Sequence, residues 1–312
     1  TKDMVGPAPE LPALLGTAVP KTNNTDLRTT GWELQIGWRD HLENGFNYGV
    51  TFNVSDAQAK VTRYPNNPTG YLGSYIENRK VGEIWGYETI GIAKTNDEMN
   101  QHLATLPNGG QSQLCDKWAA GDIMYKDLDG DGKISNGSNT LADHGDLKVI
   151  GNNTPRYLFG LDLTASWKGF DFRAFMQGVM KRDYNVNGSW GAREYLFGAT
   201  DSGVWWAAGI TGVQDYFRDS ETWSVKNGYE SENLNAYLPR PQYSEKNIHT
   251  QTRYLLNAAY LRMKNLQVGY TLPQSLVSKA GLGNVRFFVS AENLFTITDL
   301  PSQFDPETDR KS

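Results

Sequence analysis

The stretch with the most recognisable chemistry is "DLDGDGKISNGS". Its carboxylates stand at the first, third and fifth positions of a calcium-binding loop. They are followed by a glycine at the sharp turn, a residue that can offer its backbone carbonyl, and a serine at the ninth position. Three carboxylates this close repel one another unless a cation lies between them, so the spacing predicts a Ca²⁺ site. The predicted ligands are Asp127, Asp129, Asp131, the carbonyl of Lys133, and Ser135.

The twelfth position of such a loop should hold a bidentate acid, but it holds Ser138. The missing acid can come from Asp143 or Asp146 in "ADHGDL". The flanking stretches "GDIMYK" and "LKVIGN" are typical of extended chain and not of the helices of a calcium sensor, so the ion would have a structural role. The alternative is a solvated turn in which aspartate side chains accept hydrogen bonds from nearby backbone N–H groups.

A second concentration of candidate side chains is aromatic and lies between Tyr184 and Trp223. Flat rings stack on sugar faces and contact protein partners, but rings on one long loop can also pack together as a small core. The sequence leaves both readings open. The candidates for contact with a substrate or partner are Trp190, Tyr195, Trp205, Trp206 and Trp223.

Both groups of side chains must be positioned by strands. In "GWELQIGWRD" apolar residues alternate strictly with polar residues, and the same alternation returns in "GFNYGVTFNVSD". Tryptophan stands at both ends of the first apolar row, which favours a face turned towards lipid over a face turned towards a second sheet. The side chains predicted to face outward are Trp32, Leu34, Ile36, Trp38, Phe46, Tyr48, Val50 and Phe52.

The alternation predicts strands at residues 31–39, 46–56, 156–167, 170–182, 253–271 and 284–295. Their connections alternate between short and long, which is rare in soluble domains but typical of outer-membrane barrels with short periplasmic turns and long extracellular loops. The sequence therefore predicts an all-β fold, namely about six strands of a transmembrane antiparallel β-barrel. The predicted extracellular loops are 57–154, which contains the aspartate motif, and 183–252, which contains the aromatic residues.

Composition agrees with this interpretation and excludes other classes. Only 38% of the 312 residues are hydrophobic, which is low for a chain that must bury one large soluble core. The net charge of −5, without a basic stripe, argues against a nucleic-acid partner. The single cysteine, Cys115, excludes an internal disulfide framework. The sequence contains neither metal-ligand spacing among its histidines nor a nucleophile elbow, so we predict that it is not an enzyme.

The order of the motifs resembles the C-terminal portion of SusC/RagA-type TonB-dependent transporters of the Bacteroidota. The resemblance covers nearly the whole chain and rests on "GEIWGY", "GDIMYKDLDGDGKIS", "VIGNNTPRYLFG", "WKGFDF", "YLRMKNLQVGYTLP" and "NVRFFVSAENLFTIT". It implies a barrel of about 22 strands in the cell outer membrane, with a plug inside. It also implies energisation by TonB, a SusD-like surface lipoprotein as partner, and import of glycans or oligopeptides.

The sequence departs from that family in what it lacks: a TonB box, a plug, the first strands, and a final strand ending in an aromatic residue after "FDPETDRKS". It also lacks an N-terminal signal peptide. We therefore expect residues 1–312 to be a C-terminal fragment that would not transport anything alone. The alternative from another class is a soluble, calcium-stabilised glycan-binding β-domain.

Overall fold

The computed structural model describes residues 1–7, 21–186, 215–242, 246–302 and 304–307. The chain divides into two compact units. The first, called the strand unit below, comprises Arg28–Ala59, Thr154–Asp183 and Leu256–Ser312. The second, called the loop unit, comprises Thr1–Leu27, Lys60–Asn153 and Tyr184–Leu255.

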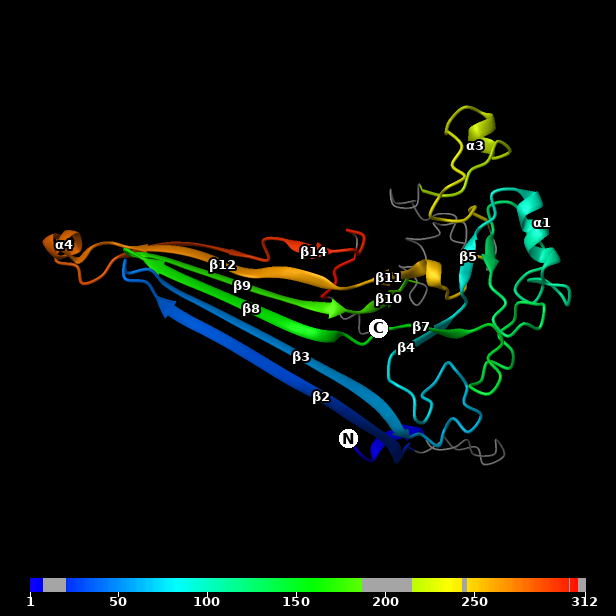
Figure 1. Ribbon diagram of the computed structural model, residues 1–312, viewed down its shortest axis with the longest axis horizontal. Coiled ribbons are helices and arrows are strands. Elements are labelled where there is room, and N and C mark those ends of the chain that lie inside the picture. Colours follow the sequence, from blue (N-terminus) through cyan, green and yellow to red (C-terminus); the bar gives the residue numbers. More distant parts are fainter. Residues whose placement is uncertain (8–20, 187–214, 243–245, 303, 308–312) are drawn as a thin grey trace. The chain divides into compact units, whose positions relative to one another are not determined.

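The main sheet contains the predicted strands in chain order. It runs β2 (Lys21–His41), β3 (Asn47–Arg63), β8 (Arg156–Trp167), β9 (Phe170–Lys181), β12 (Tyr260–Thr271) and β13 (Arg286–Glu292). Each pair from β3 to β13 is antiparallel, and Figure 1 shows β2, β3, β8, β9 and β12 side by side. Two short strands extend the sheet, because β1 (Met4–Pro7) pairs with β2 and β14 (Thr296–Thr298) pairs with β12. The predicted all-β, antiparallel fold is confirmed.

The register separates an apolar face from a polar face. One row of directly paired residues across β3, β8, β9, β12 and β13 is Val50, Leu163, Ala174, Leu266 and Ala291. The next row, on the opposite face, is Thr51, Asp162, Phe175, Asn265 and Glu292. Since successive side chains of a strand point to opposite faces, the alternation seen in the sequence becomes two different surfaces, with Phe175 as the exception in its row.

The row predicted to face outward stays accessible. Trp32, Leu34, Ile36, Trp38 and Val50 are exposed. The other three members, Phe46, Tyr48 and Phe52, are half-buried and lie beside other rings, such as Phe52 at 6.4 Å from Phe159 between ring centroids. A second sheet packed on this face would have buried these side chains.

Short connections join the strands at one end of the strand unit. β8 and β9 are linked by Lys168 and Gly169, both with positive φ (48° and 89°), which is the geometry of the two-residue turn whose twist fits a hairpin. Residues 42–46 join β2 to β3. The link from β12 to β13 contains α4 (Gln274–Val277) and the 3₁₀ turn η5 (Ser278–Ala280).

Strand ends differ from the prediction. β2 begins at Lys21 and not near residue 31, because its polar first residues pair with β1. The predicted strand 253–271 is interrupted: it starts with η4 (Thr252–Tyr254) and β11 (Leu255–Asn257), and β11 pairs with β10 (Asp183–Asn185). β13 ends at Glu292 because Asn293 adopts a left-handed conformation with φ of 51°.

The loop unit has a core of its own, although residues 57–154 were predicted as one long loop. Two small sheets form, β4 (Glu83–Gly86) with β7 (Lys148–Asn152) and β5 (Thr89–Ile92) with β6 (Ile123–Tyr125). Among the described residues of this unit, the helices are α1 (Asn96–Ala104) and α3 (Trp223–Lys226). One cluster of buried core residues consists of Tyr87, Leu106, Ile123, Tyr125 and Ile134. Among the described residues, no helix combines the length and apolar character needed to cross a membrane.

Candidate functional site

The aspartate motif lies between β6 and β7 in the loop unit, and both flanks are extended as expected. Three carboxylates come together there: one oxygen each of Asp127, Asp129 and Asp146 lie within 4.8 Å of one another. Asp146 is thus the more distant acid that joins the loop, 19 residues after Asp127 in the chain. Oxygen ligands from three carboxylates are the donor set that Ca²⁺ prefers.

Asp146 is fully buried. Its two oxygens accept hydrogen bonds from the backbone N–H groups of Leu128 (2.6 Å) and Ser135 (2.8 Å), so this side chain holds the two ends of the motif together. Burial raises the pKa of Asp146, the two N–H donors lower it, and the negative charges of Asp129 and Asp127 raise it further, with a net rise. A cation beside these three acids would offset the desolvation and the repulsion, so the residues fit a divalent ion.

Other predicted ligands lie elsewhere in the loop. The Asp131 carboxylate accepts the backbone N–H of Lys133 (3.0 Å) and lies 3.3 Å from the Lys133 ammonium. The Asp143 carboxylate accepts the hydroxyl (2.6 Å) and the N–H (3.0 Å) of Ser138, which lower its pKa. The Ser135 hydroxyl accepts the N–H of Gly137 at 3.2 Å. These bonds resemble the solvated-turn alternative, and Asp127 and Asp129 also accept backbone N–H groups within the loop. The case for a cation therefore rests on the convergence of the three acids.

Of the aromatic candidates, only Trp223 lies within the described residues; Trp190, Tyr195, Trp205 and Trp206 lie outside them. Trp223 begins α3 and is 70% exposed. Its ring stacks on that of Tyr229, which is 73% exposed, with 5.4 Å between centroids and an interplanar angle of 18°. The pair presents flat aromatic faces to solvent, which suits stacking on a sugar ring or a peptide group. Tyr229 lies outside the aromatic concentration between Tyr184 and Trp223 and is not among the residues predicted from the sequence.

The loop unit also contains a buried ion pair that carries no local sequence signal. Asp122 and Lys246 are both buried, and the ammonium lies 2.6 Å from Asp122 Oδ2. Gln242 (2.8 Å) and Asn247 (3.1 Å) donate to the other carboxylate oxygen. These residues are about 120 positions apart in the chain, so no local spacing reveals them. The pair fastens the two long connections to each other and does not resemble a catalytic site.

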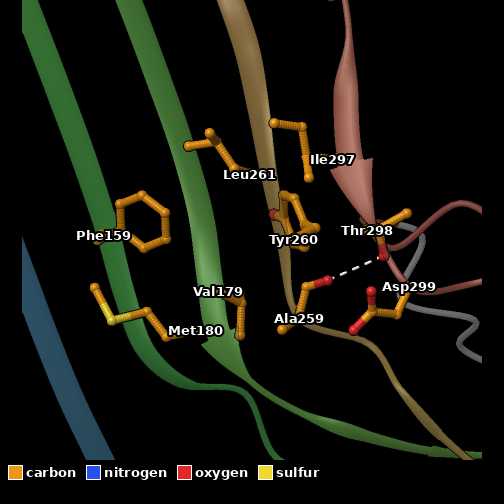
Figure 2. Close-up of a pocket in the computed structure, with 9 residues that line it drawn as sticks. All are labelled: Phe159, Val179, Met180, Ala259, Tyr260, Leu261, Ile297, Thr298 and Asp299. Carbon is orange, nitrogen blue, oxygen red and sulfur yellow. Dashed lines mark hydrogen bonds between the residues drawn. The ribbon is translucent and has the colours of Figure 1, made fainter.

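An apolar groove of about 280 Å³ opens on the strand unit where β14 pairs with β12 (Figure 2). Its walls come from β8, β9, β12 and β14, and Thr298 and Asp299 lie at one end, where the Thr298 hydroxyl donates to the Ala259 carbonyl at 2.9 Å. The lining residues are Phe159, Val179, Met180, Ala259, Tyr260, Leu261, Ile297, Thr298 and Asp299. Exposed Met180 and Ile297 continue the apolar character of the face predicted to contact lipid.

A sheet with one apolar and one polar face, short turns and long folded connections defines a class, the outer-membrane β-barrels. Comparison with known proteins narrows it. No family model matches the chain. Three TonB-dependent receptors of Formosa agariphila are similar over nearly all of it: receptor P3 is 28% identical over 100% of the chain, receptor P26 is 23% identical over 94%, and receptor P39 is 21% identical over 98%. The chain spans 28% of the length of receptors P3 and P26 and 30% of that of P39.

Solved structures agree with this similarity. The structure of the RagAB peptide transporter matches 96% of the chain with a TM-score of 0.64 at 21% identity, and the chain covers 29% of the matched protein. The RagAB peptide importer in its "open-open" state matches with a TM-score of 0.59 at 20% identity. At this identity the match shows the fold alone.

The resemblance to SusC/RagA-type TonB-dependent transporters is therefore confirmed, and with it the location in the cell outer membrane. The similar proteins are receptors and transporters, in agreement with the prediction that the chain has no enzymatic activity. The comparisons favour the barrel over the alternative of a soluble glycan-binding domain.

Proposed function

We propose that this chain is the C-terminal barrel part of a TonB-dependent outer-membrane importer. The observation that carries the proposal is the similarity to TonB-dependent receptors along the whole chain. The sheet supports it, because a barrel wall that passes polar cargo needs one face for lipid and one for water. The chain spans 28% of the length of receptor P3, and we propose that TonB energises the whole receptor.

The cargo of this importer is proposed to be an oligopeptide or a glycan, handled together with a SusD-like surface lipoprotein. The structurally similar RagAB is described as a peptide transporter, which supports the peptide. The exposed pair of Trp223 and Tyr229 supports either cargo, because both sugar rings and peptide groups stack on aromatic faces.

The test is uptake by the full-length receptor in the bacterium that carries its gene. Labelled oligopeptides and oligosaccharides of matched size would be offered to cells with the receptor, without it, and with a receptor whose TonB-binding segment is deleted. We expect uptake of one class only, and only with the intact receptor. Equal uptake in all three strains would contradict the import proposal. If no SusD-like lipoprotein copurifies with the full-length receptor, the proposal of that partner would be contradicted.

We also propose that the loop unit binds a structural Ca²⁺ through Asp127, Asp129 and Asp146. Support comes from the convergence of the three carboxylates and the burial of Asp146. Free calcium is abundant outside the cell, so a site with a dissociation constant of about 10⁻⁴–10⁻³ M would be substantially filled there. The ion would order a long connection and would not carry a signal.

A further inference from the structure

Four charged side chains meet in the strand unit at the start of β12. Arg262 and Lys264 belong to β12, whereas Asp305 and Glu307 lie in the segment after β14. The Arg262 guanidinium is 2.7 Å from Asp305 and 2.6 Å from Glu307, and the Lys264 ammonium is 2.7 Å from Glu307. The two cations and two anions balance within this network.

Three donors converge on the Glu307 carboxylate. Oε2 accepts from Arg262 Nη1 and Lys264 Nζ, and Oε1 accepts from Gln177 Nε2 at 3.1 Å. Gln177 on β9 is the cross-strand neighbour of Arg262 on β12, so two of the donors are fixed by the sheet itself. Such convergence of charged and neutral N–H groups is how proteins recognise a carboxylate.

Arg262 is held in place by bonds that do not involve Glu307. Its Nε donates to the Thr296 hydroxyl at 2.7 Å and its Nη2 donates to Asp305 at 2.7 Å. Its side chain is only 12% exposed. The guanidinium is therefore preorganised, and removing the Glu307 carboxylate would leave Nη1 aimed at the same point.

The carboxylate itself comes from a less regular part of the chain. Residues 304–307 contain neither helix nor strand. Burial alone would raise the pKa of Glu307, but hydrogen bonds from Lys264 and Gln177 and the charges of Arg262 and Lys264 lower it below its usual value. The site thus has donors on strands and an ionised acceptor on an irregular segment.

The donors lie on the polar face. Gln177 alternates with the apolar-face residues of β9 in the same phase as Asp171 and Arg173, and it pairs directly with Arg262. In an outer-membrane barrel this face lines the water-filled interior. Gln177 and Arg262 also lie towards the strand ends that lead into the long connections, which are the extracellular ends.

We propose that Arg262, Lys264 and Gln177 form a carboxylate-binding site on the interior wall, which Glu307 fills in this structure and which a carboxylate of the cargo can occupy in its place. This inference rests on the proposed import function for the interior location and for the cargo. The ligand class is a carboxylate, supplied either by the C-terminus of an oligopeptide or by an acidic sugar.

The experiment measures binding to the purified full-length receptor by equilibrium dialysis. The probes are tetra-alanine with a free C-terminus, tetra-alanine amide, trigalacturonic acid and its trimethyl ester. We expect Glu307→Gln to tighten binding of at least one acid by about tenfold and to leave its uncharged twin unchanged, because a hydrogen bond to a charged group contributes about that much. The acid that responds identifies the source of the carboxylate.

Controls separate the site from general charge effects. The double variant Arg262→Gln with Glu307→Gln should lose the gain. Arg173→Gln combined with Glu307→Gln should keep it, because Arg173 pairs with Asp162 on the same polar face and does not contact Glu307. Glu307→Asp, which shortens the acid and perturbs folding less, should give a smaller gain of the same kind.

Equal tightening for an acid and its uncharged twin would overturn the proposal, as would a gain that survives Arg262→Gln. The proposal would also be overturned if Glu307→Gln and Glu307→Asp unfold at the same temperature as the original receptor and bind both acids with the same affinity as it does. The assay needs neither TonB nor energy. If the receptor imports cargo but its variants fail this binding test, the carboxylate site is refuted and the proposed import function still stands.

Discussion

Two fully buried aspartates of the loop unit show how neighbours decide the role of a residue. Asp122 is neutralised by the Lys246 ammonium and by two amide donors. Asp146 instead faces the acids Asp127 and Asp129, and it accepts hydrogen bonds from the backbone N–H groups of Leu128 and Ser135. A buried carboxylate surrounded by acids is costly. The charge of Asp122 is compensated by a residue of the chain itself, whereas the acids around Asp146 are the reason that we propose a cation there.

Calcium should protect the loop unit from proteolysis, and Asp146→Asn should abolish that protection. The raised pKa of Asp146 means that, without the ion, the folded unit holds this proton more tightly than the unfolded chain does. The contribution of Asp146 to the free energy of unfolding is therefore fully present at low pH and is lost as the pH rises through its raised pKa. Calcium needs the charged form, so its protection should grow over the same rise in pH.

The measurement is limited proteolysis of the full-length receptor from pH 4 to pH 8, with calcium or with a chelator. Asp143→Asn is the matched control, because Asp143 is exposed, bonds Ser138 and lies outside the cluster of three acids. Protection that is insensitive to chelator, or that is lost equally in both variants, would show that the acids form only a solvated turn.

Breaking the buried pair of Asp122 and Lys246 should strongly destabilise the loop unit. Asp122→Ala leaves the ammonium buried without its carboxylate, which costs about 3–5 kcal/mol. Lys226→Ala is the control, since its pair with Glu221 is largely exposed (52% and 76%) and should contribute about 0–1 kcal/mol. Hydrogen exchange of residues 117–125 reports the local stability. Similar exchange in the two variants would mean that the buried pair does not fasten these segments.

At the scale of elements, the alternation of apolar and polar residues predicts the strands correctly because this alternation is a local property of the chain. The two faces of β3, β8 and β9 are already visible in residues 46–56, 156–167 and 170–182. The small sheets β4–β7 and β5–β6 escaped the sequence analysis because their strands have only three to five residues and pair across tens of residues. The sequence offered both Asp143 and Asp146 as the acid that joins Asp127 and Asp129, because local spacing does not show which of them folds back onto the loop.

Strand spacing also depends on particular glycines, which the sequence does not distinguish. A Cβ on Gly178 of β9 would lie 2.0 Å from the Tyr260 carbonyl oxygen, a backbone atom of β12, and 2.8 Å from the Phe159 ring. The three atoms nearest to a Cβ on Gly269 of β12 would be the ends of the Arg286 and Asp171 side chains, which pair with each other across that glycine at 2.5 Å. Backbone cannot move aside cheaply, whereas exposed side-chain ends can.

Gly178→Ala should therefore destabilise the barrel by about 1–3 kcal/mol through overpacking, whereas Gly269→Ala should cost about 0–1 kcal/mol by disturbing an exposed ion pair. The measurement is urea unfolding of the full-length receptor in lipid vesicles, followed by tryptophan fluorescence. Equal midpoints for the two variants would show that β9 and β12 do not approach as closely at Gly178 as the structure has them.

At the scale of the whole molecule, the sheet must separate two solvents. The row of Val50, Leu163, Ala174, Leu266 and Ala291 forms one side, and the row containing Thr51 and Asp162 forms the other. Because the strand period is two, a shift of one residue would turn every polar side chain towards lipid. The recurrence of this pattern in five paired strands is a stronger argument for a barrel wall than any single motif.

Charge substitutions on neighbouring residues of β3 test that separation directly. Val50→Lys places an ammonium on the apolar face and should destabilise the barrel by about 2–4 kcal/mol if this residue lies near the bilayer midplane, and by less closer to the interface. Thr51→Lys places the same charge on the polar face beside Asp162, its directly paired neighbour on β8, and should be nearly neutral. Urea unfolding in lipid vesicles compares the two variants with the original receptor, and the same pair in detergent shows how much of the difference depends on the bilayer. Equal destabilisation of both would mean that the two faces meet similar surroundings. A larger loss for Thr51→Lys would place lipid on the opposite face and reverse the assignment of the interior, including the position proposed for Arg262 and Lys264.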